Sequence, residues 1–370
     1  MATPLRVLFG ATSKSWGGNE KWAAEAATGL AERGHRVAVF CSHDPVRSEL
    51  ESRGLSTRHV ELWGDVNPVG FAALARLFRA ERPDAVVLTK QREYWMGGLA
   101  AGLAGSPLVV LRMGLRRRLR DDIKRRVAFG RTADLIIVNS QAVRETLLET
   151  SWLDPSKVRV LLNCVSLEPV SEREGRTALS ELGISPDAPV VCGAGRLTRQ
   201  KGFDILIRAF AIVREECSAA RLLILGGGGQ RRALEAVAGE LGLEDAVVFA
   251  GMRRDVRQIL ALADVYALSS RNEGMANTLL EAMSVGAPIV ATDVSGTREA
   301  VEDGAQALIV PPEDTEALAR AILSLIRDRD LAASLGRAAL ERAGAVFRKD
   351  RMTGELEAML LDGVMDARRR

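Results

Sequence analysis

The chain has 370 residues, a length that exceeds one ordinary hydrophobic core and suits two domains of about 150–200 residues each. Apolar residues make up 47% and charged residues 27%, which is the balance of a globular protein and excludes a disordered one. No apolar run approaches the roughly 20 residues that cross a bilayer. The aromatic share of 4% disfavours a nucleic-acid stacking surface.

The cysteines and the N-terminal residues indicate the cellular compartment in which the protein is expected. The four cysteines are far apart and no pair has metal-ligand spacing, so we expect free thiols and no metal site. Residues 1–10 lead directly into a strand-like run, without the layout of a signal peptide. We therefore expect a cytoplasmic protein, with any membrane contact peripheral and on the inner face of the cytoplasmic membrane.

Short apolar runs alternate with helical patterns through the first half of the chain. Runs such as residues 84–88 are apolar without alternation, as expected for strands buried on both faces of a parallel sheet. Helical patterns fill the gaps, for example at residues 20–33 and 71–82. The pattern predicts a doubly wound α/β domain. Its expected strands are residues 5–10, 36–40, 57–62, 84–88, 108–113, 134–139 and 158–162.

A polar stretch at about residues 165–188 interrupts this pattern and predicts a linker between two domains. A second α/β set follows, and helices without intervening strands end the chain after Asp314. Ligands of such sheets bind beyond the carboxyl ends of the strands. The expected strands of the second set are residues 190–195, 222–226, 247–251, 265–269, 288–292 and 307–310.

The loop at residues 195–202 places Arg196 and Lys201 five positions apart, directly after a buried strand. A diphosphate leaving group gains negative charge as a glycosidic bond breaks, and fixed cations stabilise that charge without a metal. The structural alternative is a surface turn whose charges are solvated.

The segment at residues 270–283 carries two glutamates eight positions apart, Glu273 and Glu281. A helix is expected to start near Asn277, and its N-terminal N–H groups together with Thr278 suit a phosphate. Glu281, about one turn into this helix, could accept both hydroxyls of a ribose. The structural alternative is that Asn277 caps the helix and both glutamates are solvated.

Glycine-rich turns follow one strand in each half. Residues 226–229 are four consecutive glycines, which permit close backbone approach either to a ligand or within a tight turn. Gly17 and Gly18 join the first strand to the first helix and could reach the diphosphate, although an ordinary flexible turn explains them equally well.

A basic segment at residues 112–126 holds eight basic residues and two aspartates, a local charge of +6 in a chain of net charge +3. Leu115, Leu119, Ile123 and Val127 recur every four residues and predict one face of a helix. Such a helix could contact an anionic membrane or grip an anionic acceptor. The structural alternative is a packed helix with a solvated basic face.

With these motifs in hand, the chain resembles the family 4 glycosyltransferases, which are retaining enzymes of the GT-B fold. The resemblance spans nearly the whole chain and is densest at residues 193–312. It implies two Rossmann-like domains that face a cleft, at residues 1–167 and 168–348, and a C-terminal helix at 349–370 that returns to the first domain. The matching motifs are the paired glutamates Glu273 and Glu281, the loop from Gly195 to Gly202, and residues 17–20, 34–37 and 281–292.

The resemblance also implies a metal-independent transfer from a nucleotide-diphosphate sugar, with a UDP-sugar favoured over a GDP-sugar. Arg196, Lys201 and Glu273 would be catalytic, and the acceptor would be a lipid-linked or cell-surface saccharide of the cell envelope. The implied donor-binding residues are Gly17, Gly18, Gly226, Met252, Gly274, Met275, Ala276, Asn277, Thr278, Leu279 and Glu281. The residues expected on the acceptor side are Glu20, Lys90 and Arg112.

The first domain departs from the family pattern. Many members carry a histidine after the strand that corresponds to residues 108–113, and Arg112 lies in that segment here. The alternative function is a protein of the same fold that binds or epimerises a nucleotide sugar without transferring it. A hydride-transfer enzyme is disfavoured because the dinucleotide fingerprint is absent.

Overall fold

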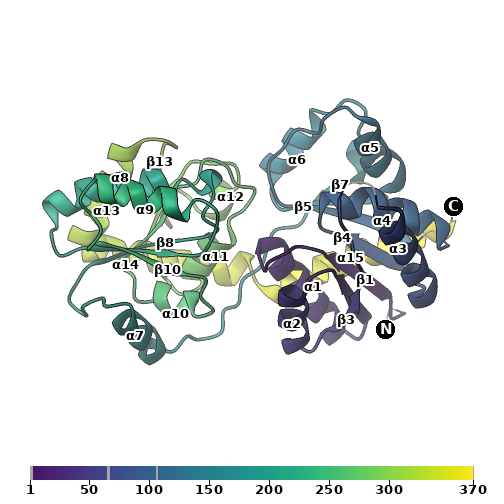
Figure 1. The fold of residues 1–370 in the computed structure, drawn as a ribbon, viewed down its shortest axis with the longest axis horizontal. Helices are drawn as coiled ribbons and strands as arrows, with labels where there is room; N and C mark the ends of the chain where they lie inside the picture. The colour runs from purple at the N-terminus through teal and green to yellow at the C-terminus, as the bar shows by residue number, and fades with distance from the viewer. Residues whose placement is uncertain (1–2, 65–66, 106, 370) are drawn as a thin grey trace. The chain divides into compact units, whose positions relative to one another are not determined.

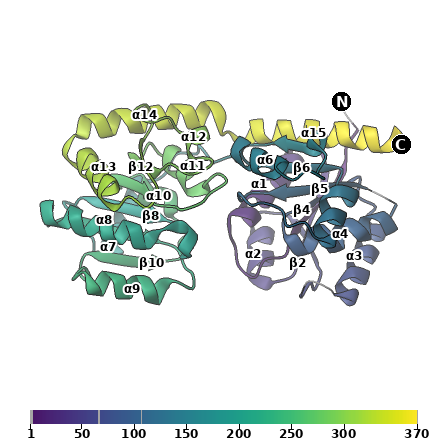
Figure 2. The same ribbon diagram turned by 90° about the horizontal axis from the view of Figure 1, so that it is seen from above.

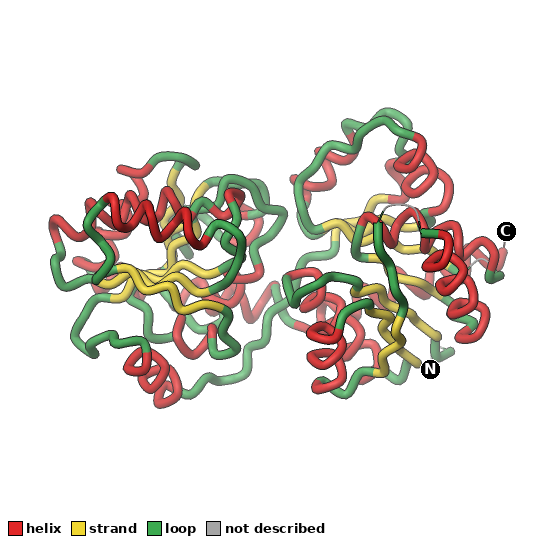
Figure 3. Tube along the Cα trace, viewed as in Figure 1, coloured by secondary structure: helices red, strands yellow, loops and turns green. Residues whose placement is uncertain are grey.

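The chain folds into two units, of which the first is Met1–Cys164 with Lys349–Arg370 and the second is Val165–Arg348. The computed structural model describes residues 3–64, 67–105 and 107–369. The outermost residues of the expected domains, 1–2 and 370, therefore lie outside the described part of the chain. The second unit begins at Val165 rather than at the expected residue 168. Each unit is built around one parallel sheet, with strands in yellow enclosed by helices in red in Figure 3.

The first sheet has seven strands in the order β3-β2-β1-β4-β5-β6-β7. Figure 1 labels β3, β1, β4, β5 and β7 of this sheet. Its strands are β1 (Arg6–Ala11), β2 (Arg36–Cys41), β3 (Ser56–His59), β4 (Ala85–Leu88), β5 (Leu108–Met113), β6 (Leu135–Val138) and β7 (Val158–Val160). Every neighbouring pair is parallel, and Val7 of β1 lies opposite Val37 of β2 and Ala85 of β4. The chain order reverses beside β1, which is where doubly wound sheets place their ligands.

Helices cover both faces of the first sheet because its strands are apolar on both sides. Phe9 of β1 belongs to a cluster with α1, α2 and α15, whereas its neighbour Leu8 belongs to a cluster with α3, α4 and α6. The helices of this unit are α1 (Gly18–Glu32), α2 (Asp44–Ser52), α3 (Pro68–Glu81), α4 (Gln91–Leu103), α5 (Ile123–Arg125), the π-helix η1 (Arg126–Thr132), α6 (Gln141–Leu148), the 3₁₀-helix η2 (Pro155–Lys157) and α15 (Lys349–Arg369).

The C-terminal helix α15 packs in the first unit, although the second unit precedes it in the chain (Figure 2). Its residues Met352, Leu356, Leu360 and Val364 are buried in the cluster that also contains Trp22 of α1. The spacing of four residues places these side chains on one face of the helix. Gly29 of α1 allows the close approach, since a side chain there would overlap Thr353.

The second sheet has six strands in the order β10-β9-β8-β11-β12-β13. Its strands are β8 (Val190–Ala194), β9 (Arg221–Leu225), β10 (Val247–Gly251), β11 (Val265–Leu268), β12 (Ile289–Thr292) and β13 (Leu308–Val310). Its pairs are all parallel as well. The prediction of two Rossmann-like α/β domains is therefore confirmed.

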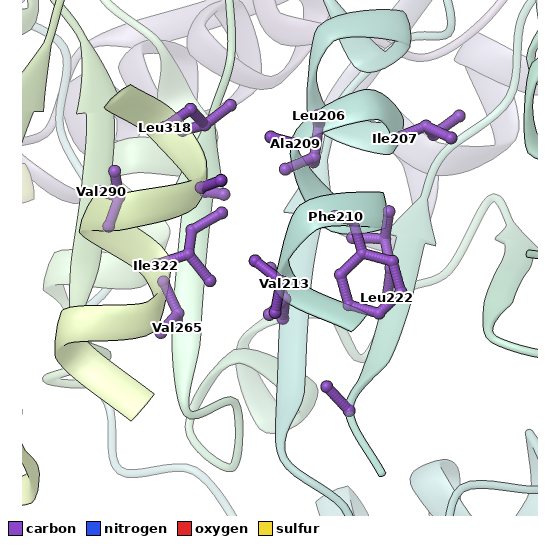
Figure 4. Packing of buried hydrophobic residues seen from close by; sticks show 14 of the residues in the cluster. Leu206, Ile207, Ala209, Phe210, Val213, Leu222, Val265, Val290, Leu318 and Ile322 are labelled. Carbon is purple, nitrogen blue, oxygen red and sulfur yellow. The ribbon is translucent and has the colours of Figure 1, made fainter. Parts of the chain in front are cut away.

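On one face of the second sheet, α8 and α13 pack over the strands, as Figure 4 shows for Phe210 and Ile322 against Leu222 and Val265. Because these side chains are fully buried, they fix the sheet from which the charged loops emerge. The helices of this unit are α7 (Glu172–Glu181), the 3₁₀-helix η3 (Arg199–Lys201), α8 (Phe203–Glu216), α9 (Arg231–Glu240), α10 (Val256–Leu260), α11 (Asn277–Met283), α12 (Thr297–Ala300), α13 (Thr315–Arg327) and α14 (Arg329–Val346).

The prediction of a linker over residues 165–188 is wrong in its extent, because the helix α7 occupies residues 172–181. Ser171 caps this helix by accepting a hydrogen bond from the Glu174 N–H. Gly175 packs so closely against α10 that a side chain there would meet the Gln258 carbonyl. The polar composition reflects a helix on the surface of the second unit.

The prediction of one amphipathic helix in the basic segment is also wrong. Residues 114–122 are not helical, α5 spans three residues, and the π-helix η1 follows it. The Asp122 side chain accepts from the Arg125 N–H, so a helix begins only after Asp122. Ile123, expected on an apolar helix face, is 71% exposed.

Across the part of the chain that the structure describes, no helix is both long enough and apolar enough to span a bilayer.

Candidate active site

In the second unit, the two neighbouring strands β8 and β11 each end in a loop that carries a predicted catalytic residue. The loop after β8 carries Lys201, and the loop after β11 carries Glu273. The Lys201 Nζ lies 2.6 Å from the Glu273 Oε1, and the Ser270 hydroxyl donates to the same oxygen at 2.9 Å. Glu273 is only 7% exposed, so its charge is stabilised by this cation and this hydroxyl.

Arg271, which the sequence analysis did not single out, connects these two loops. Arg271 lies two residues before Glu273, and its backbone N–H donates to the Gln200 carbonyl at 2.8 Å. Its guanidinium donates to the Arg199 carbonyl at 2.9 Å and makes two bonds of 2.7 Å to the Asp204 carboxylate. The η3 turn that presents Lys201 is therefore held by the loop that presents Glu273.

Charge pairing at Arg271 explains two pKa shifts. The hydrogen bonds that Arg271 donates to Asp204 and to Glu313 raise the pKa of its guanidinium above the usual range, and the bond to Asp204 is the largest cause. The Arg271 hydrogen bond in turn lowers the pKa of Asp204. Both groups therefore stay charged at neutral pH, so the ion pair between Arg271 and Asp204 is retained there.

Tyr266 and Thr278 form a buried contact beneath the predicted nucleotide segment. Tyr266 of β11 is fully buried, and its hydroxyl donates to the Thr278 Oγ1 at 2.8 Å. Burial raises the pKa of Tyr266, so this hydroxyl keeps its proton. Since the Thr278 oxygen accepts this bond, the Thr278 hydroxyl proton is directed elsewhere and remains suited to a phosphate oxygen.

The structural alternative for this segment is wrong. Glu281 is 8% exposed and Glu273 is 7% exposed, so neither glutamate is solvated. The N-cap position of α11 is Ala276, and Asn277 is the first helical residue, so Asn277 does not cap the helix. Burying two carboxylates eight residues apart carries a desolvation cost, which the contacts with Lys201 and Ser270 offset at Glu273.

The glycine turn after β9 packs against the loop that carries Arg196. A Cβ at Gly226 would lie 1.9 Å from the Gly195 carbonyl oxygen, and Gly226 has a φ of +137°. A Cβ at Gly228 would lie 2.4 Å from the Leu197 oxygen. The tight-turn interpretation therefore accounts for these glycines, and Gly226 supports the Arg196 loop through its backbone.

Arg196 and Met252 are the exposed members of the predicted donor set. Within the described ranges, the Arg196 side chain makes no ion pair or hydrogen bond, and it is exposed to solvent. Met252 is 68% exposed and lies beside Gly227, where an added Cβ would be 3.3 Å from the Met252 Cγ. Of the other predicted donor residues, Gly274, Met275, Ala276 and Leu279 are buried.

In the first unit, the residues expected on the acceptor side come together at the carboxyl ends of three neighbouring strands. Glu20 follows β1, Lys90 follows β4 and Arg112 is in β5. The Lys90 Nζ lies 2.8 Å from the Glu20 Oε1. Glu20 is fully buried, and its Oε2 has no hydrogen-bond partner among the described residues. Gly17 is the N-cap residue of α1, and Gly18 is its first residue.

Arg112 is 3% exposed and is held from three sides. Its Nη2 donates to the Asn163 Oδ1 at 2.9 Å, its Nη1 donates to the Asn19 Oδ1, and its guanidinium lies 4.8 Å from the centre of the Trp22 ring. Burial lowers the pKa of Arg112 to about 10, although the charges of Tyr94 and Glu20 oppose the shift. Arg112 therefore remains a cation at neutral pH and cannot serve as a base.

Glu93 is a further buried group that sequence reasoning missed. Its carboxylate accepts hydrogen bonds from the N–H groups of Thr12 (2.9 Å), Thr89 (2.7 Å) and Lys90 (2.9 Å), and from the Thr12 hydroxyl (2.6 Å). Burial raises the pKa of Glu93, and these hydrogen bonds oppose the shift. Glu93 joins the end of β1 to the end of β4 and so orients Lys90. The capping-box position of Glu93, three residues after Lys90, was the available signal.

Two family models match the chain, one in each half. Residues 16–169 match "Glycosyltransferase Family 4", and residues 188–328 match "Glycosyl transferases group 1". The chain is 29% identical over 342 residues to the lipopolysaccharide core biosynthesis glycosyltransferase LpsE of Rhizobium meliloti, covering 91% of this chain and 94% of that protein. It is also 29% identical to a D-inositol 3-phosphate glycosyltransferase of Saccharomonospora viridis, covering 90% and 86%.

Solved structures share the fold over almost the entire chain. The structure of Anabaena Alr3699/HepE in complex with UDP-glucose has a TM-score of 0.86 at 25% identity, covering 96% of this chain and 99% of that one. WaaG, a glycosyltransferase of lipopolysaccharide biosynthesis, has a TM-score of 0.75 at 17% identity and covers 96% and 99%.

Two Rossmann-like units with charged loops at the carboxyl ends of their parallel strands define a protein of the GT-B glycosyltransferase class. The two family models, one over each unit, give the narrower assignment. The chain belongs to glycosyltransferase family 4, and it is an enzyme of that family.

Proposed function

We propose that this enzyme transfers a sugar from a UDP-sugar to a hydroxyl of a saccharide or lipid-linked acceptor, with retention at the anomeric carbon and without a metal. The observation that carries this proposal is the 2.6 Å contact between Lys201 and Glu273, which places a cation and a buried carboxylate at the ends of neighbouring strands. The complex of HepE with UDP-glucose supports the choice of donor. LpsE supports an acceptor of the cell envelope.

In the proposed mechanism, Lys201 and Arg196 hold the diphosphate. The Lys201 ammonium has three N–H donors, so it can keep its bond to Glu273 and still donate to a phosphate oxygen. As the bond from the anomeric carbon to the diphosphate oxygen breaks, its electron pair passes to that oxygen. The two cations stabilise the charge that develops there.

The acceptor hydroxyl attacks on the face that the leaving group departs from. Its proton passes to the leaving phosphate oxygen while its oxygen bonds to the anomeric carbon. The Glu273 Oε1 is taken by Lys201 and Ser270, which leaves Oε2 to accept from hydroxyls of the transferred sugar. Glu281 would accept the ribose hydroxyls, and Thr278 would donate to the diphosphate.

On the acceptor side, we propose that Glu20, Lys90 and Arg112 act as one group. The buried carboxylate of Glu20 has one oxygen paired with Lys90, and its other oxygen is buried without a hydrogen-bond partner among the described residues. Arg112, a fixed cation in the segment where many family members have histidine, contributes charge and no proton transfer.

For residues 112–126, we also propose peripheral contact with an anionic membrane. Liposome co-sedimentation tests this contact, and we expect binding that depends on anionic lipid and weakens with salt.

A panel of UDP-, GDP-, ADP- and TDP-sugars tests the donor assignment, with thermal stabilisation and slow donor hydrolysis as readouts. We expect UDP-sugars to stabilise the protein most. Glu281→Ala should weaken UDP-sugar binding about tenfold or more, because a buried carboxylate contact to the ribose is lost. Glu240→Ala, at an exposed residue of the same unit, is the control. Unchanged affinity in Glu281→Ala would show that this residue does not hold the nucleotide.

A further inference from the structure

A small pocket in the first unit lies outside the site described above. It has a volume of about 60 Å³ and is bounded by α4, α5 and η1. Tyr94 and Phe129 form its buried part, with their rings 5.5 Å apart in an edge-to-face contact. The residues that line it are Gln91, Arg92, Tyr94, Trp95, Lys124, Arg125, Ala128 and Phe129.

The lining is basic, although Arg125 pairs with the carboxylate of Asp122 just outside it. Arg92, Lys124 and Arg125 contribute three positive charges, and no lining residue is a carboxylate. Arg92 is oriented by its bond to the Leu62 carbonyl at 3.0 Å, and Arg125 is oriented by its pair with Asp122. A guanidinium has five N–H donors, so these contacts leave several for a ligand. The pocket is therefore suited to an anion with more than one acceptor oxygen.

The volume of the pocket limits the size of the anionic group that it can hold. A cavity needs about 10–15 Å³ to hold one water molecule, and the volume of this pocket, about 60 Å³, is several times that minimum. Pockets for whole drug-sized ligands are roughly 300–1,000 Å³. The space therefore fits one tetrahedral or planar anionic group, and the body of the ligand would lie outside, where the half-buried Trp95 ring offers a surface for a sugar.

One chain neighbour and one hydrogen bond connect the pocket to the acceptor-side residues. Gln91, at its edge, follows Lys90, which pairs with Glu20. The Tyr94 hydroxyl, in its wall, donates to the Arg112 carbonyl at 2.5 Å. The pocket and the cluster that we assign to the acceptor therefore share the N-terminal turn of α4 and the Tyr94 contact to β5.

We propose that this pocket binds a phosphate group carried by the acceptor. The proposal rests on the proposed function and narrows it, because it specifies a phosphorylated saccharide, polyol or lipid-linked sugar as the substrate class. The two cations Arg92 and Lys124, from α4 and α5, recognise the phosphate, and Trp95 contacts the adjoining sugar or polyol.

The test uses the full chain saturated with UDP, so that the diphosphate loop is occupied. Glycerol 3-phosphate is the soluble probe, glycerol is the uncharged probe, and sodium chloride matches the ionic strength. A rise in Tm with glycerol 3-phosphate alone is expected for the wild type. The double variant Arg92→Gln with Lys124→Gln should bind this probe at least about tenfold more weakly, since it loses two charged donors.

A matched control removes the same number of charges outside the pocket. Arg131→Gln with Arg159→Gln changes two exposed arginines of the first unit that do not line the pocket, and it should bind like the wild type. Phosphatidic acid in phosphatidylcholine vesicles presents the same phosphate on a lipid. A response to the soluble probe supports a soluble phosphorylated acceptor, and a variant-sensitive response to vesicles alone supports a lipid-borne phosphate.

Equal binding by the two double variants, equal stabilisation by glycerol, or no response to either phosphate source would overturn the proposal. If the Arg92→Gln and Lys124→Gln pair does not fold, the single change Lys124→Glu at this half-buried position provides the same comparison. Hydrolysis of the UDP-sugar without acceptor should be unchanged in these variants. Failure of UDP to stabilise any variant would contradict the donor assignment and leave the comparison of phosphate binding intact.

Discussion

Lys201 and Glu273 each stabilise the other before any substrate binds. A buried carboxylate of 7% exposure without a cation would be costly, and an ammonium beside it would otherwise be solvated and free to move. Their contact of 2.6 Å therefore fixes the position of both groups. Preorganised charges of this kind stabilise a transition state without the cost of reorienting them during the reaction.

Arg196 differs from Lys201 because its side chain is exposed and has no ion-pair or hydrogen-bond partner within residues 3–64, 67–105 and 107–369. We expect Arg196→Ala to reduce kcat by roughly 100-fold while the KM for the donor changes little, since the leaving-group charge is greatest in the transition state. Steady-state kinetics with the best UDP-sugar measures both constants.

The control for this change is Arg199→Ala, which removes an exposed cation three residues away whose backbone carbonyl, and not its side chain, contacts Arg271. Arg199→Ala should leave both constants within a few fold. An unchanged kcat in Arg196→Ala would remove Arg196 from the mechanism, and a change confined to KM would restrict it to ground-state binding.

At the scale of the elements, the η3 turn and the β11 loop behave as one piece because Arg271 joins them. Arg271→Ala should lower kcat by about tenfold or more, since Lys201 loses the support of its turn, and should lower the free energy of unfolding by about 2–3 kcal/mol through the loss of charged hydrogen bonds. Kinetics and thermal unfolding measure the two effects.

Arg298→Ala is the matched control for Arg271→Ala. Arg298 also makes a two-pronged pair with an aspartate, Asp293, but its side chain is 60% exposed and the pair joins no catalytic loops. A surface pair of this kind contributes about 0–1 kcal/mol. If both variants lost stability equally while retaining full activity, the proposed positioning role of Arg271 would be wrong.

The basic segment shows where sequence patterns fail to predict elements. The repeat of Leu115, Leu119, Ile123 and Val127 fits a helix, yet residues 114–122 are not helical and α5 begins only at Ile123. Asp122 is a good N-cap residue, and this local signal competes with the apolar repeat. Several of the arginines are paired individually, as Arg118 is with Glu149, and such pairs do not require a helix.

By contrast, the strands of both sheets could be predicted because the signal is local. Each central strand is a short run of apolar residues, such as 85–88 in β4, and burial on both faces removes any alternation. The loops that follow these strands could therefore be placed at the carboxyl edge of a sheet, which is why Lys201 and Glu273 were predicted as partners of one site.

At the scale of the whole molecule, long-range contacts set the environment of Arg112. Its two hydrogen-bond partners, Asn19 and Asn163, are 93 and 51 residues away in the sequence. No local pattern indicates that this arginine is fully buried or that Trp22 lies over it. The sequence analysis indicated only that Arg112 lies in a segment where many family members carry a histidine, and the fold shows that this cation is fixed in place.

The return of the chain from the second unit to the first depends on contacts of α15, and one of them is sensitive to pH. The His35 Nδ1 accepts from the Leu5 N–H, so Nε2 is the ring nitrogen that donates to the Glu357 carboxylate, at 2.9 Å. Arg33 donates to the other oxygen at 2.5 Å. Burial opposes ionisation of Glu357, but the hydrogen bonds of His35 and Arg33 outweigh it and lower the pKa of Glu357.

A group whose pKa is lower in the folded state stabilises the fold above its unfolded pKa of about 4.5, and the stabilisation is lost as the pH falls through the folded value. Glu357→Gln should therefore lower the Tm most at pH 6–7, by an amount corresponding to about 1–2 kcal/mol. The difference from the wild type should begin to shrink below about pH 4.5 and vanish once the pH is below the lowered folded pKa, where the wild-type carboxyl is neutral as well. Glu355→Gln, on the same helix and paired with Arg351 at the surface, should show little difference at any pH. A difference for Glu357→Gln that stayed constant across this range would mean that the shape of the side chain, and not its charge, holds α15 against the first unit.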